Sequence, residues 1–175
     1  MPGPRVLDLG VGPGTSAVEA ALAAPGRRAI GLDASAAMLR RARLAAARAG
    51  VALPLLRADA LHLPIRTGAL DGATGHSLLY LLPDPAAALA ELWRAVRPGG
   101  RVAFLEPAAT PGSAGAALRG GARFAASMAL WRVMSGLHRR YEPAGLSALL
   151  NGAGFREVRV LPALSGHALL ACATR

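Results

Sequence analysis

The chain has 175 residues, of which 53% are hydrophobic and 17% are charged. This length is typical of one domain, since domains usually have roughly 100–200 residues, and the hydrophobic fraction excludes a disordered chain. The longest stretch without a charged residue, 160–174, is shorter than the ~18 residues of a membrane-spanning helix and predicts no span. The single cysteine, Cys172, excludes an internal disulfide and a cysteine-rich zinc site.

The charge balance is strongly basic. Twenty arginines and no lysine face ten acidic residues, which gives a formal net charge of +10. Such an excess suits a surface for phosphates, nucleic acid or anionic lipid, so peripheral membrane contact is one open interpretation. The bias toward alanine, arginine, glycine and proline is equally typical of a GC-rich genome. Residues 1–5 lead directly into a run that contains Asp8, which does not resemble a signal peptide and predicts a cytoplasmic protein.

Strand-like runs alternate with stretches of helical period. We expect strands at 5–9, 28–32, 51–57, 70–74, 101–105, 155–161 and 167–174. We expect helices at 15–24, 36–49, 86–96, 123–138 and 143–151, the first of them stopped by Pro25-Gly26. This order predicts one α/β domain over 1–175, with a doubly wound, seven-stranded, mostly parallel sheet and helices on both faces. The last two strands are close enough in sequence to form an antiparallel hairpin.

A glycine-rich turn follows the first predicted strand. It reads Val6-Leu7-Asp8-Leu9-Gly10-Val11-Gly12-Pro13-Gly14-Thr15. Glycines between a strand and a helix let the backbone approach a ligand and direct helix N–H groups toward it. The third glycine falls one residue early for a dinucleotide-binding turn, and a carboxylate at Asp8 suits an ammonium group better than a pyrophosphate.

Acidic residues also follow the second and third predicted strands. Asp33 lies 19 residues after Gly14, where a carboxylate can accept both ribose hydroxyls. Asp59 follows the third strand and can accept from an exocyclic adenine amine. Because parallel strands end at the same edge of a sheet, we expect Asp8, Asp33 and Asp59 to share one crevice. A turn or cap role would explain one of them more easily than all three.

With these motifs the chain resembles the class I S-adenosylmethionine-dependent methyltransferases of the small-molecule type. The resemblance covers the glycine turn, 31–39, 56–64, 70–85 and 91–100, and it implies a Rossmann-like fold that binds S-adenosylmethionine. Gly10, Gly12 and Gly14 would surround the methionine part, with Asp8 near its amino group. Asp33 would bind the ribose. The remaining implied contacts are Ala34 and Met38 near the adenosine, Asp59 and Ala60 at the adenine edge, and Gly75 and His76 at the sulfonium end.

The family resemblance implies methyl transfer, which requires alignment of the two reactants and a base only where the acceptor must lose a proton. His76 is the best-placed candidate base, although a loop histidine that only bonds backbone is an equal alternative. Tyr80 is a candidate acid or a pocket wall. His138 and Tyr141 are more typical of surface residues. The histidines show no metal-ligand spacing, so we expect no metal.

The segment 107–140 interrupts the strand–helix alternation and is the expected lid and substrate segment. Its apolar stretch 125–134 includes Met128 and Trp131, which favours a hydrophobic or aromatic small-molecule acceptor as much as plain core packing. Relatives that the chain resembles carry helices before the first strand. Here the strand begins at Arg5, so either the chain starts late or its pocket is unusually open.

Two alternatives to a small-molecule methyltransferase stay open. A nucleic-acid methyltransferase would fit the arginines, but the residues after the fourth strand, 75–78, lack the Asn/Asp-Pro-Pro-aromatic motif of that class, which disfavours a nucleic-acid partner. A cofactor-binding scaffold without catalysis is the second alternative. The sequence assigns neither the acceptor nor the oligomeric state.

Overall fold

The computed structural model describes residues 4–24, 26 and 28–175. Pro25, one of the two residues expected to stop the first helix, lies outside the described residues. Seven strands form one sheet in the order β3-β2-β1-β4-β5-β7-β6. Their bounds are β1 (Arg5–Leu9), β2 (Arg28–Asp33), β3 (Leu55–Arg57), β4 (Leu70–His76), β5 (Val96–Pro107), β6 (Arg156–Ala163) and β7 (Ala168–Thr174). Strands β1 to β5 are parallel and β7 runs antiparallel to β5 and β6, which confirms the predicted sheet and hairpin.

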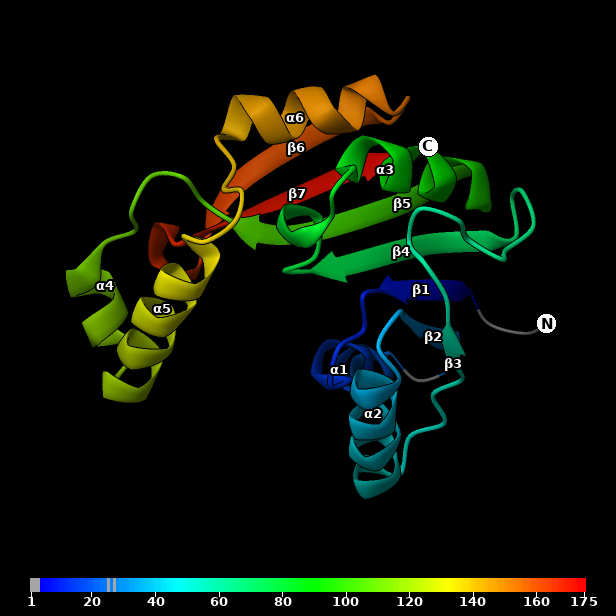
Figure 1. Cartoon of the computed structure of the whole chain (residues 1–175), viewed down its shortest axis with the longest axis horizontal. Helices are drawn as coiled ribbons and strands as arrows, with labels where there is room; N and C mark the ends of the chain where they lie inside the picture. Colours follow the sequence, from blue (N-terminus) through cyan, green and yellow to red (C-terminus); the bar gives the residue numbers. More distant parts are fainter. Residues whose placement is uncertain (1–3, 25, 27) are drawn as a thin grey trace.

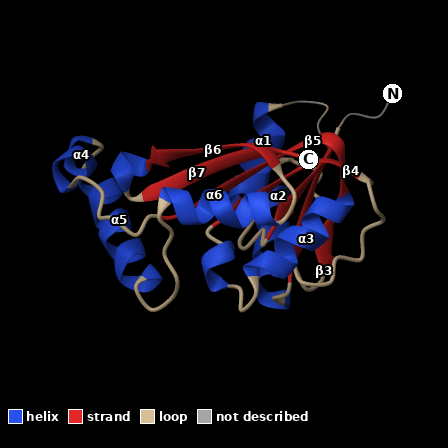
Figure 2. Cartoon of the chain, turned by 90° about the horizontal axis from the view of Figure 1, so that it is seen from above, coloured by secondary structure: helices blue, strands red, loops and turns tan. Residues whose placement is uncertain are grey.

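Helices cover both faces of the sheet. On one face α1 (Thr15–Ala23) and α2 (Ala36–Ala49) pack together and against β2. On the other face α3 (Pro85–Ala95) and α6 (Pro143–Gly152) pack together, α3 against β5 and α6 against β6 and β7. Right-handed crossovers explain this division, because the chain reverses its direction across the sheet after β3. Figure 2 shows α1 on one side of the strands and α3 and α6 on the other.

The hydrophobic core has a large and a small part. Beneath α3 and α6 the sheet buries Leu7, Phe104 and Phe155 completely or almost so. A smaller cluster under α1 and α2 contains Val11 and Leu39. Both parts lie against β1 or the loop that follows it, so the glycine turn is anchored from two sides.

Local sequence signals explain most helix boundaries. Ser35 caps α2 by accepting a hydrogen bond from the Met38 N–H, and the helix ends at Gly50 in a left-handed conformation. Asp84 caps α3 by accepting from the Ala87 N–H, with Pro85 in the first turn. The bounds of α2 are those predicted, and α3 begins and ends one residue before the predicted 86–96.

Three boundary predictions were wrong. The third strand is only Leu55–Arg57, not 51–57, because the Val51 N–H bonds the Ala46 carbonyl at the end of α2 and Pro54 has no N–H to donate. The fifth strand is Val96–Pro107, not 101–105, since Val96 already pairs with Leu70. The helix expected at 123–138 is α5 (Ala122–Ser135), and the helix that precedes it, α4 (Ala114–Arg119), was not predicted. In Figure 1 this pair projects from the carboxyl end of β5, beyond the sheet.

Candidate functional site

The glycine turn adopts backbone conformations that favour glycine. Gly10, Gly12 and Gly14 have φ of 68°, 54° and 90°. A Cβ on Gly14 would lie 2.8 Å from the Ala42 Cα, so this glycine lets α1 start directly against α2. A Cβ on Gly12 would meet only the Gly10 carbonyl, at 3.9 Å. The turn therefore combines tight packing at Gly14 with open space at Gly12.

The first turn of α1 has no side-chain cap. Its N-cap residue is Gly14, which has no side chain to accept from the helix N–H groups. The next helix, α2, has the Ser35 cap described above. Uncapped N–H groups at a helix start attract polar or negatively charged ligand atoms. The α1 start is thus suited to a ligand and the α2 start is already satisfied.

Asp33 ties the glycine turn to the end of β2. Its Oδ2 accepts from the Gly12 N–H at 2.9 Å, and its Oδ1 accepts from the Ser35 N–H at 2.8 Å. The residue is half-buried, and each carboxylate oxygen has a second lone pair. Asp33 is therefore oriented by the backbone and can still accept from a ligand. Its contact with ribose hydroxyls stays a prediction.

Asp8 is almost completely buried between β1, β4 and α1. The Ser16 hydroxyl donates to Oδ2 at 2.8 Å and the Thr74 hydroxyl donates to Oδ1 at 2.9 Å. Burial raises the pKa of this carboxyl, while the two hydroxyls and the nearby His76 oppose the rise. Both oxygens thus already have protein partners that the sequence did not reveal. The expected contact of Asp8 with an ammonium group stays a prediction.

The adenosine candidates lie on the loops after β2 and β3. Asp59 is exposed, and its Oδ1 accepts from the Leu61 N–H at 2.9 Å, which lowers the pKa of the carboxyl. Ala60 beside it is buried. Met38 is half-buried in the first turn of α2, and Ala34 is exposed just before that helix. Asp59 Oδ2 also lies 3.4 Å from the Nδ1 of the exposed His62, so a ligand amine would share or replace this contact.

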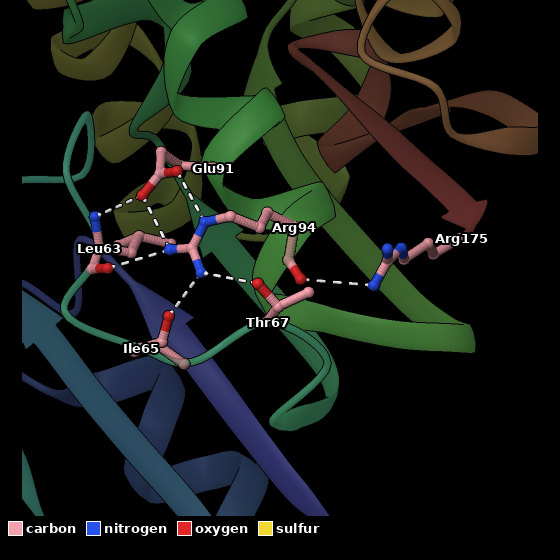
Figure 3. Close-up of polar contacts among 6 residues, drawn as sticks. All are labelled: Leu63, Ile65, Thr67, Glu91, Arg94 and Arg175. Carbon is pink, nitrogen blue, oxygen red and sulfur yellow. Dashed lines mark hydrogen bonds and ion pairs between the residues drawn. The ribbon is translucent and has the colours of Figure 1, made fainter.

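An ion pair on α3 holds the loop that follows Asp59 and Ala60 (Figure 3). Glu91 Oε2 accepts from the Leu63 N–H at 2.9 Å, and Arg94 Nε donates to Glu91 Oε1 at 2.8 Å. The Arg94 guanidinium also donates to the carbonyls of Leu63 at 3.1 Å and Ile65 at 2.7 Å. Sequence reasoning missed this clamp, although an acidic and a basic residue three apart on a helix are a recognisable signal.

The loop after β4 packs against the glycine turn. The Leu78 side chain lies so close to Gly10 that a Cβ there would be 2.6 Å from Leu78 Cδ1. Gly75 pairs with Leu9 across the sheet, and a Cβ on it would be 2.7 Å from the Phe104 ring. His76 ends the strand with an exposed side chain. The structure thus brings Gly75 and His76 next to the turn that contains Gly10, and their contact with a cofactor stays a prediction.

Glu106 is a buried carboxyl that sequence reasoning missed. Its Oε1 accepts from the N–H groups of Leu78 and Leu79 at 3.0 and 2.8 Å, and its Oε2 accepts from the Tyr80 N–H at 3.2 Å. The side chain is fully buried, and this burial raises its pKa to about 7. The only available signal was a lone charge within the apolar run 102–109. Glu106 fixes the backbone of the loop that carries Tyr80.

Tyr80 is where this loop meets the inserted segment. Its ring lies edge-on to His138, with ring centroids 5.8 Å apart. Burial raises the pKa of the Tyr80 phenol, Glu106 raises it further, and the neighbouring Trp131 side chain lowers it. The phenol is therefore neutral at physiological pH and forms a wall between the two segments. His138, expected at the surface, is exposed but contacts this wall. The same expectation was wrong for Tyr141, which is buried in the hydrophobic core.

The described residues contain no grouped metal ligands, and the linings of two cavities include neither Asp33 nor Asp59. Across residues 4–24, 26 and 28–175, no three His, Cys, Asp or Glu side chains are grouped closely enough to hold a metal ion. One cavity of about 460 Å³ is lined by Val6, Thr74 and Cys172, and another of about 280 Å³ is lined by Thr110 and Glu142. Neither includes Asp33 or Asp59.

Comparisons with known proteins agree with this geometry. A family model described as a methyltransferase domain matches residues 7–104, more than half of the chain. The demethylmenaquinone methyltransferase of Thermus thermophilus is 40% identical over 102 residues, which are 58% of this chain and 46% of that protein. The trans-aconitate 2-methyltransferase of Deinococcus radiodurans is 38% identical over 105 residues, 59% of this chain and 38% of that protein. These matches span less than half of each relative.

The fold itself is shared with solved structures. A SAM-dependent methyltransferase from Aquifex aeolicus superposes with a TM-score of 0.74 and 18% identity, covering 98% of this chain and 81% of that one. Likeness at this identity shows the fold alone. The family-model match adds the sequence evidence, since it includes the glycine turn, Asp33 and Asp59. The chain therefore belongs to the class I S-adenosylmethionine-dependent methyltransferase family.

Proposed function

We propose that the protein transfers a methyl group from S-adenosylmethionine to a small, hydrophobic or aromatic acceptor. The observation that carries this proposal is the pairing of Asp33 with the Gly12 N–H beside the uncapped start of α1. Asp33 supplies an oriented acceptor for hydroxyls, and the start of α1 supplies free N–H donors beside it. A nucleoside joined to an amino acid requires both kinds of group. Family membership supports the same conclusion.

The residues around the crevice fit this cofactor in chemical type. Gly10, Gly12 and Gly14 would hold the methionine part. The Asp8 carboxylate, just before this turn, would attract the amino group of that part electrostatically. Asp33 would accept from the ribose. The other proposed contacts are Ala34, Met38, Asp59 and Ala60 around the adenosine, and Gly75 and His76 at the sulfonium end. The open space at Gly12 and the exposed Asp59 carboxylate support this assignment.

The bound cofactor would supply an already activated methyl group. The protein therefore has to align the acceptor and exclude water. We propose His76, exposed at the end of β4, as the group that accepts a proton where the acceptor has one to lose. Tyr80 is proposed as a pocket wall, because its raised pKa keeps the phenol protonated.

The segment 107–140 is the proposed substrate lid. Met128 and Trp131 are half-buried on the side of α5 that faces the body of the protein, and Trp131 lies near Tyr80. An apolar and aromatic lining favours an apolar acceptor. Two of the similar proteins are named for demethylmenaquinone and trans-aconitate, which are both small molecules. A cytoplasmic location belongs to the same proposal and is tested by cell fractionation.

Titration calorimetry with S-adenosylmethionine and S-adenosylhomocysteine tests cofactor binding. Replacing Asp33 with Ala should weaken binding about 100-fold, since hydrogen bonds to a charged group contribute roughly 1.5–3 kcal/mol each. The matched control is Asp71→Ala, because Asp71 pairs with Arg5 and Arg97 at the other end of β4. Absence of binding by the wild-type protein would contradict the proposal.

Turnover on a panel of acceptors then separates the remaining alternatives. Trp131→Ala should lower the rate on apolar acceptors at least tenfold and leave cofactor affinity unchanged. Methylation of RNA in place of small molecules would support a nucleic-acid enzyme. Cofactor binding without turnover on any acceptor would support a scaffold.

A further inference from the structure

The inserted segment carries half of the net positive charge of the chain. Residues 107–141 contain five arginines and no acidic residue, and all ten acidic residues lie elsewhere. Three of these arginines are exposed: Arg119, Arg123 and Arg139. Two carboxyls flank the segment in sequence: Glu106, which is fully buried and bonded to backbone N–H groups, and Glu142, which is exposed. Between them no acidic side chain offsets the five arginines.

The same segment exposes a row of large apolar side chains. On α5 and just after it these are Leu130, Val133, Met134 and Leu137, with 53–77% of each residue exposed. Spacings of three, four and seven residues place them on one face of a helix. Leu118 at the end of α4 is 63% exposed as well. We call these five residues the outer stripe.

The orientation of α5 is set by contacts on its opposite face. Arg132 donates to the carbonyls of Ala108 at 3.2 Å and Ala109 at 2.9 Å, and Ser135 is buried. The α5 part of the outer stripe therefore points away from the body of the protein, and Figure 1 shows that α4 and α5 lie beyond the sheet. Contiguous exposed apolar groups of this kind usually mark an interaction surface.

We infer that the outer stripe docks onto the surface of an anionic phospholipid bilayer. Apolar side chains would enter the boundary between headgroups and acyl chains, while Arg119 and Arg123 contact lipid phosphates. Charge favours this partner over a second copy, because a symmetric contact would bring the same arginines together. The apolar side chains of the outer stripe favour lipid over nucleic acid as the partner. The outer surface of a nucleic acid offers phosphates but no apolar layer that these side chains could enter.

This inference does not depend on methyl transfer. Among the described residues no helix is long and apolar enough to cross a membrane, so the contact would be peripheral. If the proposed function holds as well, docking would place the lid where an apolar acceptor is dissolved. The lid could then receive its substrate directly from the bilayer.

Vesicle flotation without added cofactor tests the inference. The wild-type protein should bind vesicles of phosphatidylcholine with about one third phosphatidylglycerol at least tenfold more tightly than pure phosphatidylcholine. The variant L130Q/V133Q should lose about tenfold in affinity for the anionic vesicles. Its matched control is Leu44→Gln, because Leu44 is 56% exposed in the middle of another 14-residue helix, α2, and lies outside the stripe.

A second pair of variants tests the charge. R119Q/R123Q should weaken binding at least tenfold, whereas R41Q/R43Q, the same charge change on α2, should weaken it less than threefold. Equal losses in stripe and control variants, or no binding by the wild type, would overturn the inference. Light scattering that shows a dimer of the wild type, and a monomer of L130Q/V133Q, would overturn it as well. So would RNA that displaces the vesicles from the protein, if only the arginine variants lose this competition. Calorimetry with S-adenosylmethionine on L130Q/V133Q keeps this result separate from the proposed function.

Discussion

Two regions meet at the carboxyl edge of the sheet and are held in different ways. Around the glycine turn, buried or half-buried carboxylates bind backbone N–H groups: Asp33 binds Gly12, and Glu106 binds the loop after β4. The inserted segment is tied by backbone hydrogen bonds at its ends, such as Ser113 N–H to the Ser165 carbonyl. Its helix α5 is attached through side chains, by the Arg132 contact and by His138 beside Tyr80 just after the helix, and its part of the outer stripe faces outward. The proposed cofactor half is thus preorganised, and the proposed acceptor half is free to adapt.

This difference has a physical cause. A carboxylate that accepts from backbone N–H groups fixes the chain itself, because a backbone donor has no rotamers of its own. A helix held by one guanidinium and one aromatic contact keeps most of its surface in water. The comparison predicts that equivalent substitutions have unequal effects in the two regions.

Two N-cap glycines give the sharpest test. Gly14 starts α1 and Gly121 starts α5, with φ of 90° and 101°. Gly14→Ala should lower the free energy of unfolding by about 4 kcal/mol, since backbone strain adds to a contact of 2.8 Å with the Ala42 Cα. Gly121→Ala should cost about 2 kcal/mol, because nothing lies within 4 Å of its Cβ. Urea unfolding measures both, and equal losses would contradict the comparison.

Glu106→Gln tests the buried carboxyl through pH. Because its pKa is raised from 4.5 to about 7 in the folded state, the native protein holds more protons than the unfolded chain between these values. Its contribution to stability is therefore complete below pH 4.5 and is lost as the pH rises through 7. The wild type should lose about 3 kcal/mol relative to the Gln variant between pH 4.5 and 8. Parallel pH profiles of the two proteins in urea unfolding would show that Glu106 does not titrate this way.

Arg132→Met should loosen the inserted segment by about 1 to 2 kcal/mol, because two hydrogen bonds to carbonyls are lost while the apolar stem remains. Amide hydrogen exchange should become faster within 114–135 and stay unchanged at β1 and β4. Arg123→Met on the exposed side of the same helix is the control. Faster exchange throughout the sheet would mean that the segment is part of the core.

Leu130→Gln should have the smallest effect on folding. The residue is 64% exposed, so its replacement should change the free energy of unfolding by less than about 0.5 kcal/mol. Vesicle binding should fall in the same variant. A loss of stability above about 1 kcal/mol would show that the leucine is packed and that the outer stripe is not free.

Local chemistry explains what could be predicted. The glycine turn, the Ser35 and Asp84 caps and the alternation of strands and helices are properties of neighbouring residues, and each was recognisable in the sequence. The same reasoning failed at β3, where it gave too little weight to Pro54. It also missed α4, because the proline, glycine and serine residues at 111–115 indicated a loop.

By itself the sequence determined the order of the elements, the sheet and the gathering of Asp33 and Asp59 at one edge, because these follow from local periodicity and from parallel strand ends. Only the tertiary structure decided that Thr74 bonds Asp8 from 66 residues away and that Glu106 holds the loop of Leu79. It also decided which face of α5 is exposed. Such contacts depend on how distant segments pack, and no spacing within one segment encodes them.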